Sequence, residues 1–349
     1  MSVVDPGSAN PMKDSEAVRL EVSAAYSRAL EHAKRNAGGC CAPAAEETAA
    51  EETAAEETAA EETAAEETAA EETAAEETAA DTCCGAAPED AAPAPTSCCG
   101  PSAADLGDAA AGAGGVASTL AGYGEERKEA PQVASFGCGN PLAFAEVKPG
   151  QTVVDLGSGP GLDLILAARR VGPSGLVIGI DMTDAMIEEA RRNAARARLS
   201  NIEVRKGLIE SLPVEDGTVD WIISNCVINL SPEKPRVFAE IARVLRPGGQ
   251  FRISDIVVEE LPAWIRESAA AYAACVAGAI PEAEYLAGLE RAGLTDVAVE
   301  HRLVYSAAQI RGLIDHDLKS HGLASDALAG VLDEIEGKVW SAYFRGRRP

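Results

Sequence analysis

The sequence is short of positive charge. Only 30 of its 349 residues are Lys or Arg, against 56 Asp and Glu, and the formal net charge is −26. A protein that binds nucleic acid needs Lys and Arg to neutralise the phosphates, so this balance argues against a nucleic-acid partner. Seven consecutive AAEET repeats, from Ala44 to Thr78, contribute 14 of the acidic residues. Without them the formal net charge is −12, which is ordinary for a soluble enzyme.

Long apolar runs are also missing. No segment approaches the ~20 apolar residues that a membrane helix needs, and the start of the chain, MSVVDPGSANPMKDSE, lacks the basic and apolar regions of a secretory signal. We therefore expect a cytoplasmic protein with no membrane partner. Thiols stay reduced in the cytosol, so the nine cysteines are expected to be unpaired. They favour thiol chemistry or soft-ion binding over a disulfide framework.

Residues 1–122 form the first predicted region, a low-complexity arm. It begins with a predicted helix, residues 15–35, whose apolar side chains share one face: Val18, Val22, Tyr26 and Leu30. Three cysteine doublets follow: Cys40-Cys41, Cys83-Cys84 and Cys98-Cys99. The AAEET repeat between the first two advances roughly 140° per unit on an α-helix, so no single apolar face forms. It is predicted to be a solvated helix or a disordered spacer without a direct function.

Residues 123–300 form the second predicted region, in which strand and helix patterns alternate from about Gly137 onward. The predicted strands read QTVVDL, LVIGID, IEVRK, TVDWIIS and QFRISDIV. Helices are predicted between and after them, at about 161–170, 183–198, 233–245, 262–278 and 281–292. Such alternation indicates an α/β fold in which helices cover both faces of a doubly wound, mostly parallel sheet. A last strand, DVAVEHRLVY, is expected to lead into residues 301–349, a small C-terminal helical extension.

A glycine-rich turn, DLGSGPG, follows the first of these strands. Its glycines, Gly157, Gly159 and Gly161, permit positive φ and a close backbone approach to a ligand at the start of a helix. Asp181 ends the next strand, where a carboxylate accepts hydrogen bonds from the ribose hydroxyls of a nucleotide. The turn departs from the dinucleotide fingerprint GxGxxG, and Asp155 would repel a pyrophosphate but suits a cationic sulfonium and ammonium. S-adenosylmethionine is therefore the predicted cofactor.

Three further positions are predicted to contact this cofactor. Met182 follows Asp181 and is expected against the adenine, and Ile209, after the third strand, is expected near the adenine too. Asn225 ends the fourth strand, in the segment SNCVINL, and Asn229 lies in the same segment. Each of these two amides either contacts the cofactor or orients the turn, and the sequence leaves both roles open.

Three cysteines lie within the predicted α/β region. Cys226 follows the fourth strand at its carboxyl end, the edge of an open sheet where ligands bind. Cys138 lies in SFGCGNP, a glycine-flanked turn before the first strand, and Cys275 lies near the end of the helix predicted at 262–278. A lone cysteine is commonly a small buried hydrophobe, but the turn around Cys138 does not fit a core strand.

Taken together, the segments GCGNP, VVDLGSGPG, GIDMT, SNCVINLSPEK, RVLRPGG, SDIV and CVAGA resemble the arsenite S-adenosylmethionine methyltransferase family over about residues 123–305. The resemblance implies a class I methyltransferase fold, which is Rossmann-like. It also implies that Cys138, Cys226 and Cys275 hold trivalent arsenic as thiolates beside the methyl donor and are catalytic. Arsenite and methylarsenite would be the substrates, with glutathione or thioredoxin as reductant.

The predicted function is thus the transfer of methyl groups from S-adenosylmethionine to thiol-bound trivalent arsenic, a detoxification reaction. Two alternatives stay open: a methyltransferase for a small organic molecule, and a thiol-based protein that sequesters arsenic without catalysis. The three cysteine doublets depart from the family, whose similar members carry a cysteine pair before the core. Which doublet corresponds to that pair is left open, as is whether the doublets take part in turnover.

Overall fold

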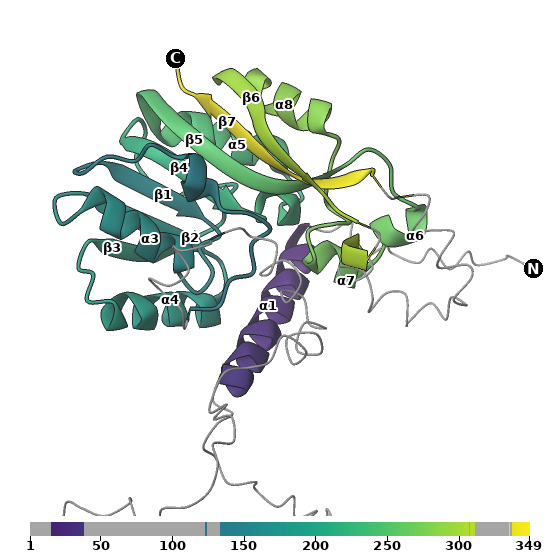
Figure 1. Ribbon diagram of the computed structural model, residues 1–349, viewed down its shortest axis with the longest axis horizontal. Coiled ribbons are helices and arrows are strands. Elements are labelled where there is room, and N and C mark those ends of the chain that lie inside the picture. The colour runs from purple at the N-terminus through teal and green to yellow at the C-terminus, as the bar shows by residue number, and fades with distance from the viewer. Residues whose placement is uncertain (1–14, 38–122, 124–132, 307, 311–334, 336) are drawn as a thin grey trace, which may run out of the picture. The chain divides into compact units, whose positions relative to one another are not determined.

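The computed structural model describes residues 15–37, 123, 133–306, 308–310, 335 and 337–349. Its centre is a seven-stranded sheet with the order β3-β2-β1-β4-β5-β7-β6 (Figure 1). The strands are β1 (Thr152–Leu156), β2 (Leu176–Asp181), β3 (Ile202–Lys206), β4 (Val219–Asn225), β5 (Leu245–Val258), β6 (Thr295–Val304) and β7 (Val339–Arg347). The neighbouring strands among β3, β2, β1, β4 and β5 pair in parallel. β7 pairs antiparallel with both β5 and β6. The predicted doubly wound, mostly parallel sheet is therefore confirmed.

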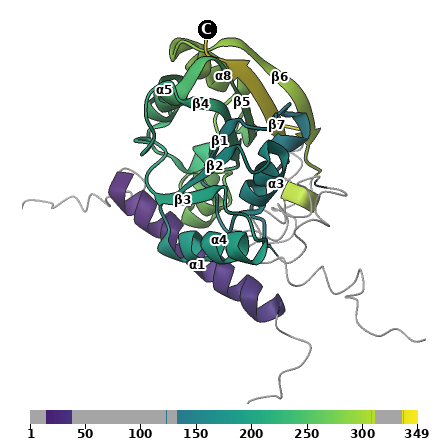
Figure 2. The same ribbon diagram turned by 90° about the vertical axis from the view of Figure 1, so that its left-hand side faces the viewer.

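Helices cover both faces of this sheet. The described helices are α1 (Ser15–Ala37), α3 (Leu162–Val171), α4 (Asp184–Arg196), α5 (Lys234–Val244), α6 (Ala263–Arg266), α7 (Ala269–Ala273) and α8 (Glu282–Arg291), with the short 3₁₀ turns η3 (Pro141–Phe144) and η4 (Ile228–Leu230). α3 and α4 pack on one face, and α5 and α8 on the other (Figure 2). Successive side chains of a strand point to opposite faces, so Val153 of β1 joins the core with α3 and Val154 joins the core with α5. Both are apolar because both faces are covered.

β1 and β4 lie side by side at the centre of the sheet, although β2 and β3 come between them in the chain. The strand order reverses at this point: the chain moves outward from β1 through β2 to β3 and then returns to β4. Ligands of open α/β sheets bind beyond the carboxyl ends of the strands at such a reversal. Residues that follow β1, β2 and β4 are therefore positioned to form a site.

α1 is the described part of the predicted N-terminal arm. Val18, Val22 and Leu30 are buried, as expected for one apolar face. The helix lies against α4 and α7 (Figure 1, Figure 2). The cysteine doublets and the AAEET repeats lie outside the described residues. Among the helices that the structure describes, none combines the length and apolar character needed to cross a membrane.

The prediction that residues 301–349 close the chain as helices is wrong for β7. Residues 339–347 form a strand that pairs with β5 along nine residue pairs. Their sequence, VWSAYFRGR, shows no simple alternation because the first six residues are buried on both faces. The strand is decided by pairing with distant segments, which local sequence does not reveal. Residues 308–310 and 335 are helical, and residues 311–334 lie outside the described residues.

Candidate active site

A pocket opens at the carboxyl ends of β1, β2 and β4, with an empty volume of about 920 Å³, part of it open to solvent. Seven of the eight residues predicted to hold the cofactor line it: Asp155, Gly157, Gly159, Asp181, Met182, Ile209 and Asn225. Gly161, the eighth, adopts φ +93° as the residue before α3, where an added Cβ would lie 3.3 Å from Ala190 of α4. The predicted residues therefore converge on one pocket, and their contacts with a cofactor stay a prediction.

The glycine turn brings the end of β1 close to the segment after β4. Gly157 has φ +63°, and a Cβ there would come within 2.2 Å of the Val227 side chain, so only glycine fits. Gly159 donates its backbone N–H to Asp181 Oδ2 at 2.9 Å. The other carboxylate oxygen of Asp181 accepts from Thr183 N at 2.9 Å. Asp181 thus braces the turn against the end of β2.

Three aspartates make the pocket acidic: Asp155, Asp163 and Asp181; a fourth carboxylate in the lining, Glu210, is paired with Arg19. Burial raises the pKa of Asp155 well above its usual value, and the charges of the other two aspartates raise it further. Burial also raises the pKa of Asp181, against the backbone hydrogen bonds that it accepts. A bound cation would relieve this repulsion. The buried Ser158 hydroxyl also lines the pocket and has no hydrogen-bond partner among the described residues, so it is available to a ligand. The pocket therefore fits a ligand that carries positive charge.

The three predicted catalytic cysteines come together beside this pocket, and Cys226 lines it. Cys138 and Cys226, 88 positions apart, form a disulfide with a Cα–Cα distance of 5.7 Å. Cys275 is free and buried, and its thiol donates to the Cys226 carbonyl with 2.7 Å between Sγ and O. Burial raises the pKa of the Cys275 thiol far above its usual value. The structure joins the three cysteines, while their role as arsenic ligands stays a prediction.

The expectation that all cysteines are unpaired is wrong for Cys138 and Cys226. Cys138 precedes β1 and Cys226 follows β4, and these two strands are neighbours in the sheet. A disulfide forms when folding brings two Cα atoms within roughly 4.4–6.8 Å. The strand order decides that approach, and the spacing of the two cysteines along the chain does not reveal it.

The helix predicted at 262–278 is interrupted before Cys275. Two short helices, α6 and α7, stand in its place, and the helical structure ends at Ala273. Cys275 has φ +64°, in the left-handed region that non-glycine residues seldom occupy, so the chain turns there. Cys226 is left-handed as well, with φ +59°. Two of the three cysteines thus occupy strained turns, as residues at functional sites often do.

α1 supplies one wall of the pocket, which the sequence analysis did not predict. Arg19, Val22 and Tyr26 line the pocket, and the Tyr26 hydroxyl lies 3.8 Å from Cys275 Sγ. Tyr26 also packs edge-to-face on Phe136, with 5.9 Å between ring centroids. The apolar periodicity of the helix indicated a buried face but not the surface that covers it. The helix contacts both the pocket and the cysteine cluster.

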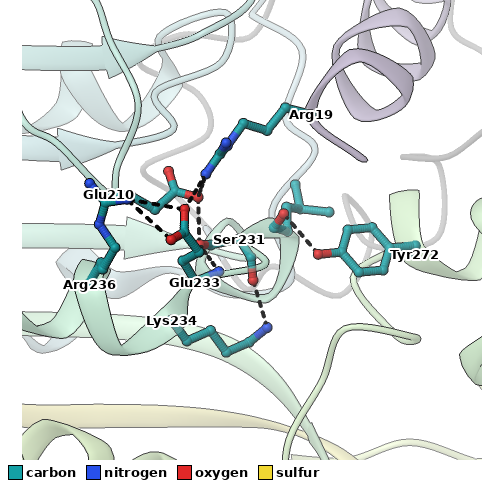
Figure 3. Close-up of polar contacts among 8 residues, drawn as sticks. Arg19, Glu210, Ser231, Glu233, Lys234, Arg236 and Tyr272 are labelled. Carbon is teal, nitrogen blue, oxygen red and sulfur yellow. Dashed lines mark hydrogen bonds and ion pairs between the residues drawn. The ribbon is translucent and has the colours of Figure 1, made fainter. Parts of the chain in front are cut away.

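Arg19 fastens α1 to two elements at the pocket rim (Figure 3). Its guanidinium donates to Glu210 at 3.1 Å and to Glu233 at 2.8 Å. Only 4% of the Glu210 side chain is exposed, and it also accepts from Ser231 Oγ at 2.7 Å. A buried carboxylate needs partners of this kind to offset its desolvation. Arg19 thereby joins α1 to the β3–β4 connection and to the start of α5.

The segment after β4 is held by side chains from α5 and α7 (Figure 3). Lys234 Nζ donates to Ser231 O at 3.0 Å and to Asn229 O at 3.2 Å. The Tyr272 hydroxyl donates to Leu230 O at 3.1 Å. These bonds satisfy the carbonyl groups that the short η4 turn leaves without helical partners. They hold the loop that forms one side of the pocket.

The chain is similar to known methyltransferases. A family model described as a methyltransferase domain matches residues 147–302. An arsenite methyltransferase of Halobacterium salinarum is 46% identical over 214 residues, which cover 58% of this chain and 54% of the relative. An arsenite methyltransferase of Aquipseudomonas alcaligenes is 40% identical over 178 residues, which cover 48% of this chain and 50% of the relative. The chain thus spans about half the length of these curated relatives.

A solved structure decides the family. The arsenic(III) S-adenosylmethionine methyltransferase from Chlamydomonas reinhardtii is 33% identical, with a TM-score of 0.50, and the match covers 67% of this chain and 73% of that protein. The chain belongs to the arsenite methyltransferase family. As a member of this family it has the predicted class I methyltransferase fold, with a mostly parallel seven-stranded sheet.

In this arsenite methyltransferase family member, a carboxylate that the sequence analysis missed lies at the disulfide. A side-chain oxygen of Asp255, in β5, lies within 4.8 Å of both Cys138 Sγ and Cys226 Sγ. Burial raises the pKa of Asp255 to about 7, while the Lys234 ammonium opposes the rise. The Tyr285 hydroxyl donates to Asp255 at 3.2 Å. The signal for it was an acidic residue directly before the apolar end of a predicted strand, in SDIVV.

Proposed function

We propose that this protein is an S-adenosylmethionine-dependent arsenite methyltransferase that carries trivalent arsenic on Cys138, Cys226 and Cys275. One observation carries the proposal: Cys226 lines the pocket beside the glycine turn, and both other cysteines contact Cys226. Cys138 does so through the disulfide, and Cys275 through its thiol hydrogen bond to the Cys226 carbonyl. The activity named for relatives at 46% and 33% identity supports the substrate.

The pocket suits S-adenosylmethionine as the methyl donor. Asp155 and Asp163 would attract its cationic groups, and Asp181 would accept hydrogen bonds from its ribose hydroxyls. Met182 and Ile209 would contact the adenine. When bound, this cofactor would supply an electrophilic methyl group for the arsenic lone pair.

The three cysteines would hold the substrate in position. Trivalent arsenic is soft and binds thiolates, and three sulfur ligands leave its lone pair pointing away from them. Because that lone pair is the nucleophile, the chain needs no general base for the transfer. The contribution of the protein is to orient the arsenic towards the methyl group, which removes much of the entropic barrier of a two-reactant step.

The disulfide between Cys138 and Cys226 has to be reduced before both bind arsenic, because the thiolate is the ligating form. Reduction breaks the S–S bond and requires two electrons and two protons. Two glutathione molecules, which become glutathione disulfide, or one dithiol protein such as thioredoxin would supply them. We propose these thiols as reductants, with arsenite and methylarsenite as substrates.

The test is to incubate the full-length protein with arsenite, S-adenosylmethionine and glutathione, and then to separate the arsenic species by chromatography. We expect methylated arsenicals and S-adenosylhomocysteine to form together, and neither to form with Cys226→Ser. Arsenic binding without consumption of S-adenosylmethionine would instead indicate a sequestering protein. Cofactor binding without arsenite binding would indicate a methyltransferase for a small organic molecule.

A further inference from the structure

We propose that Asn225 and Asn229, the two amides that flank Cys226, are positioning residues that assemble the three-cysteine site. Each of them binds the backbone of a segment that carries one of the other two cysteines. Under the proposed function, on which this inference rests, the two amides determine where the arsenic ligands stand. The contacts themselves involve only protein atoms, so they can be tested without arsenic.

Asn225 binds the turn that carries Cys138. Its Oδ1 accepts from Gly139 N at 3.0 Å, and its Nδ2 donates to Gly139 O at 2.6 Å. Both backbone groups of the residue after Cys138 are thus paired, as a neighbouring strand would pair them. On the other side of Cys138, a Cβ at Gly137 would lie 2.2 Å from Asn225 Cγ. The turn packs directly on the amide, which explains why a glycine precedes this cysteine; at Gly139, which follows it, a Cβ would instead lie 1.9 Å from Ser254 Oγ.

The Asn225 amide is itself held in this orientation. Its Nδ2 also donates to the Tyr123 hydroxyl at 2.8 Å and to Asp163 Oδ2 at 3.3 Å. The Tyr123 hydroxyl in turn donates to the Asp163 carboxylate, 2.9 Å from each oxygen. Both polar atoms of the Asn225 side chain therefore have protein partners, although the residue lines the pocket. Its two hydrogen bonds to Gly139 hold the turn that carries Cys138.

Asn229 binds the turn that carries Cys275. It is fully buried, and its Nδ2 donates to Cys275 O at 3.2 Å and to Ile256 O at 2.6 Å. Its backbone N–H donates to Asp255 Oδ2 at 3.2 Å. A Cβ at Gly278 would come within 2.1 Å of Asn229 O, so the chain after Cys275 also packs against this residue. One asparagine thus joins the Cys275 turn to the end of β5.

The backbone of Cys226 separates the two roles. With φ +59°, Cys226 turns the chain where β4 ends, so Asn225 stays in β4 and Asn229 enters η4. Each amide then serves one neighbouring segment. Loss of the first amide should loosen the Cys138 turn, and loss of the second should loosen the Cys275 turn. The two effects should be separable because the two amides share no partner.

The first measurement follows the cysteines without arsenic. The full-length protein is equilibrated in glutathione redox buffers, and the disulfide between Cys138 and Cys226 is quantified by peptide mapping. Asn225→Ala removes both hydrogen bonds to Gly139, so we expect the equilibrium constant for disulfide formation to fall about tenfold or more. Asn229→Ala should leave that constant within about threefold of the wild-type value. It should instead raise the rate at which iodoacetamide alkylates Cys275, by about tenfold.

Asn201→Ala is the matched control. The Nδ2 of Asn201 also donates to two backbone carbonyls, Ala168 O at 3.0 Å and Gly172 O at 2.9 Å. These contacts lie at the amino end of β3 and the end of α3, away from the cysteines. We expect this variant to resemble the wild type in the disulfide equilibrium and in Cys275 alkylation, with any change confined to the melting temperature.

The second measurement is methylation. In Asn225→Ala, kcat for arsenite should fall, and kcat for methylarsenite should fall less. In Asn229→Ala, kcat should fall for both substrates. The affinity for S-adenosylmethionine in calorimetry should stay within about threefold in Asn229→Ala, and in Asn225→Ala it should fall by less than kcat does. A fall in that affinity large enough to explain the kinetic loss would overturn the inference, because the amides would then act on the cofactor.

The inference would also be overturned if the equilibrium constant for disulfide formation were the same in Asn225→Ala as in Asn201→Ala. Should Asn225→Ala fail to fold, Asn225→Gln keeps the amide but displaces it by one methylene, and it must show the same weakening of the disulfide. If the wild type does not methylate arsenite while the disulfide equilibrium shifts as expected, the proposed function fails and the positioning role stands.

Discussion

Arg19 and Glu210, which lie 191 positions apart in the chain, form an ion pair with 3.1 Å between Nη2 and Oε1. The same guanidinium reaches Glu233 at the start of α5, and Tyr26 of the same helix reaches Cys275. The N-terminal helix is therefore a structural part of the pocket, although a long low-complexity stretch separates it from the α/β region in the sequence.

Arg19→Ala should weaken binding of S-adenosylmethionine by about tenfold, because one wall of the pocket loses its attachment. It should also lower the melting temperature, since the buried Glu210 carboxylate loses its charged partner. Calorimetry and thermal unfolding measure the two effects. Arg236→Ala is the control, because Arg236 pairs with Glu233 at 3.1 Å on the exposed side and such pairs contribute little. Equal effects of the two substitutions would show that α1 is not anchored through Arg19.

Asp181→Ala should lower the affinity for S-adenosylmethionine by about tenfold or more, because hydrogen bonds to a charged group are lost. Arsenite binding should persist. Each oxygen of Asp181 also accepts a backbone N–H, from Gly159 or Thr183, and Asp181→Asn keeps only one of these acceptors, so it should weaken binding as well. Asp184→Ala serves as control, because that exposed carboxylate pairs with Lys206 outside the pocket. Unchanged affinity of Asp181→Ala in calorimetry would remove the ribose assignment.

The three cysteines should differ between successive methylations. Arsenite offers arsenic three exchangeable positions, whereas methylarsenite has one position taken by carbon and needs two thiols. Cys138 precedes the first strand and is expected to be the dispensable third ligand, so Cys138→Ser should lose arsenite methylation yet methylate methylarsenite. Cys226→Ser and Cys275→Ser should lose both.

This division of roles is best measured in a full-length protein whose cysteine doublets are replaced by Ser, so that no doublet thiol substitutes for Cys138. Arsenic speciation with each substrate gives the result. Loss of methylarsenite turnover in Cys138→Ser, or its retention in Cys226→Ser, would contradict the division.

Asp255 should make stability depend on pH. Burial raises its pKa in the folded protein to about 7, against roughly 3.9 in an unfolded chain. Between these values the folded state keeps a proton that the unfolded state has lost, so the free energy of unfolding should fall as pH rises from about 4 to 7. The fall is on the order of 2–4 kcal/mol. Asp255→Asn does not titrate and should flatten this part of the curve in urea unfolding. Parallel curves for the two proteins would refute the assignment.

Deletion of the AAEET array, Ala44 to Thr78, should leave melting temperature and turnover nearly unchanged. A repeat of five residues presents no single apolar face to bury, so it contributes little to a folded core. Thermal unfolding and the arsenic speciation assay check this. A large loss in either would show that the array packs on the core or supplies the site.

Local sequence was enough to predict the parts of the site that follow from strand ends. The glycine turn, Asp181 and Cys226 each directly follow or end a strand of the α/β pattern, and parallel strands place their carboxyl ends at one edge. Their convergence could therefore be predicted from order and spacing alone. The buried face of α1 was also predictable, because the spacing of its apolar residues follows the helical period and is visible in the local sequence.

Only the tertiary structure decided which distant segments meet. The Cys138–Cys226 disulfide depends on β1 and β4 being neighbours, and the wall that Arg19 attaches depends on carboxylates 191 and 214 positions away. β7 was missed because a strand buried on both faces carries no alternation, and its partner β5 lies far from it in sequence. The left-handed turn at Cys275 replaced a predicted helix because packing against Asn229 overrides local helix propensity. Sequence patterns record local periodicity, whereas these contacts depend on which surfaces cover one another once the chain has folded.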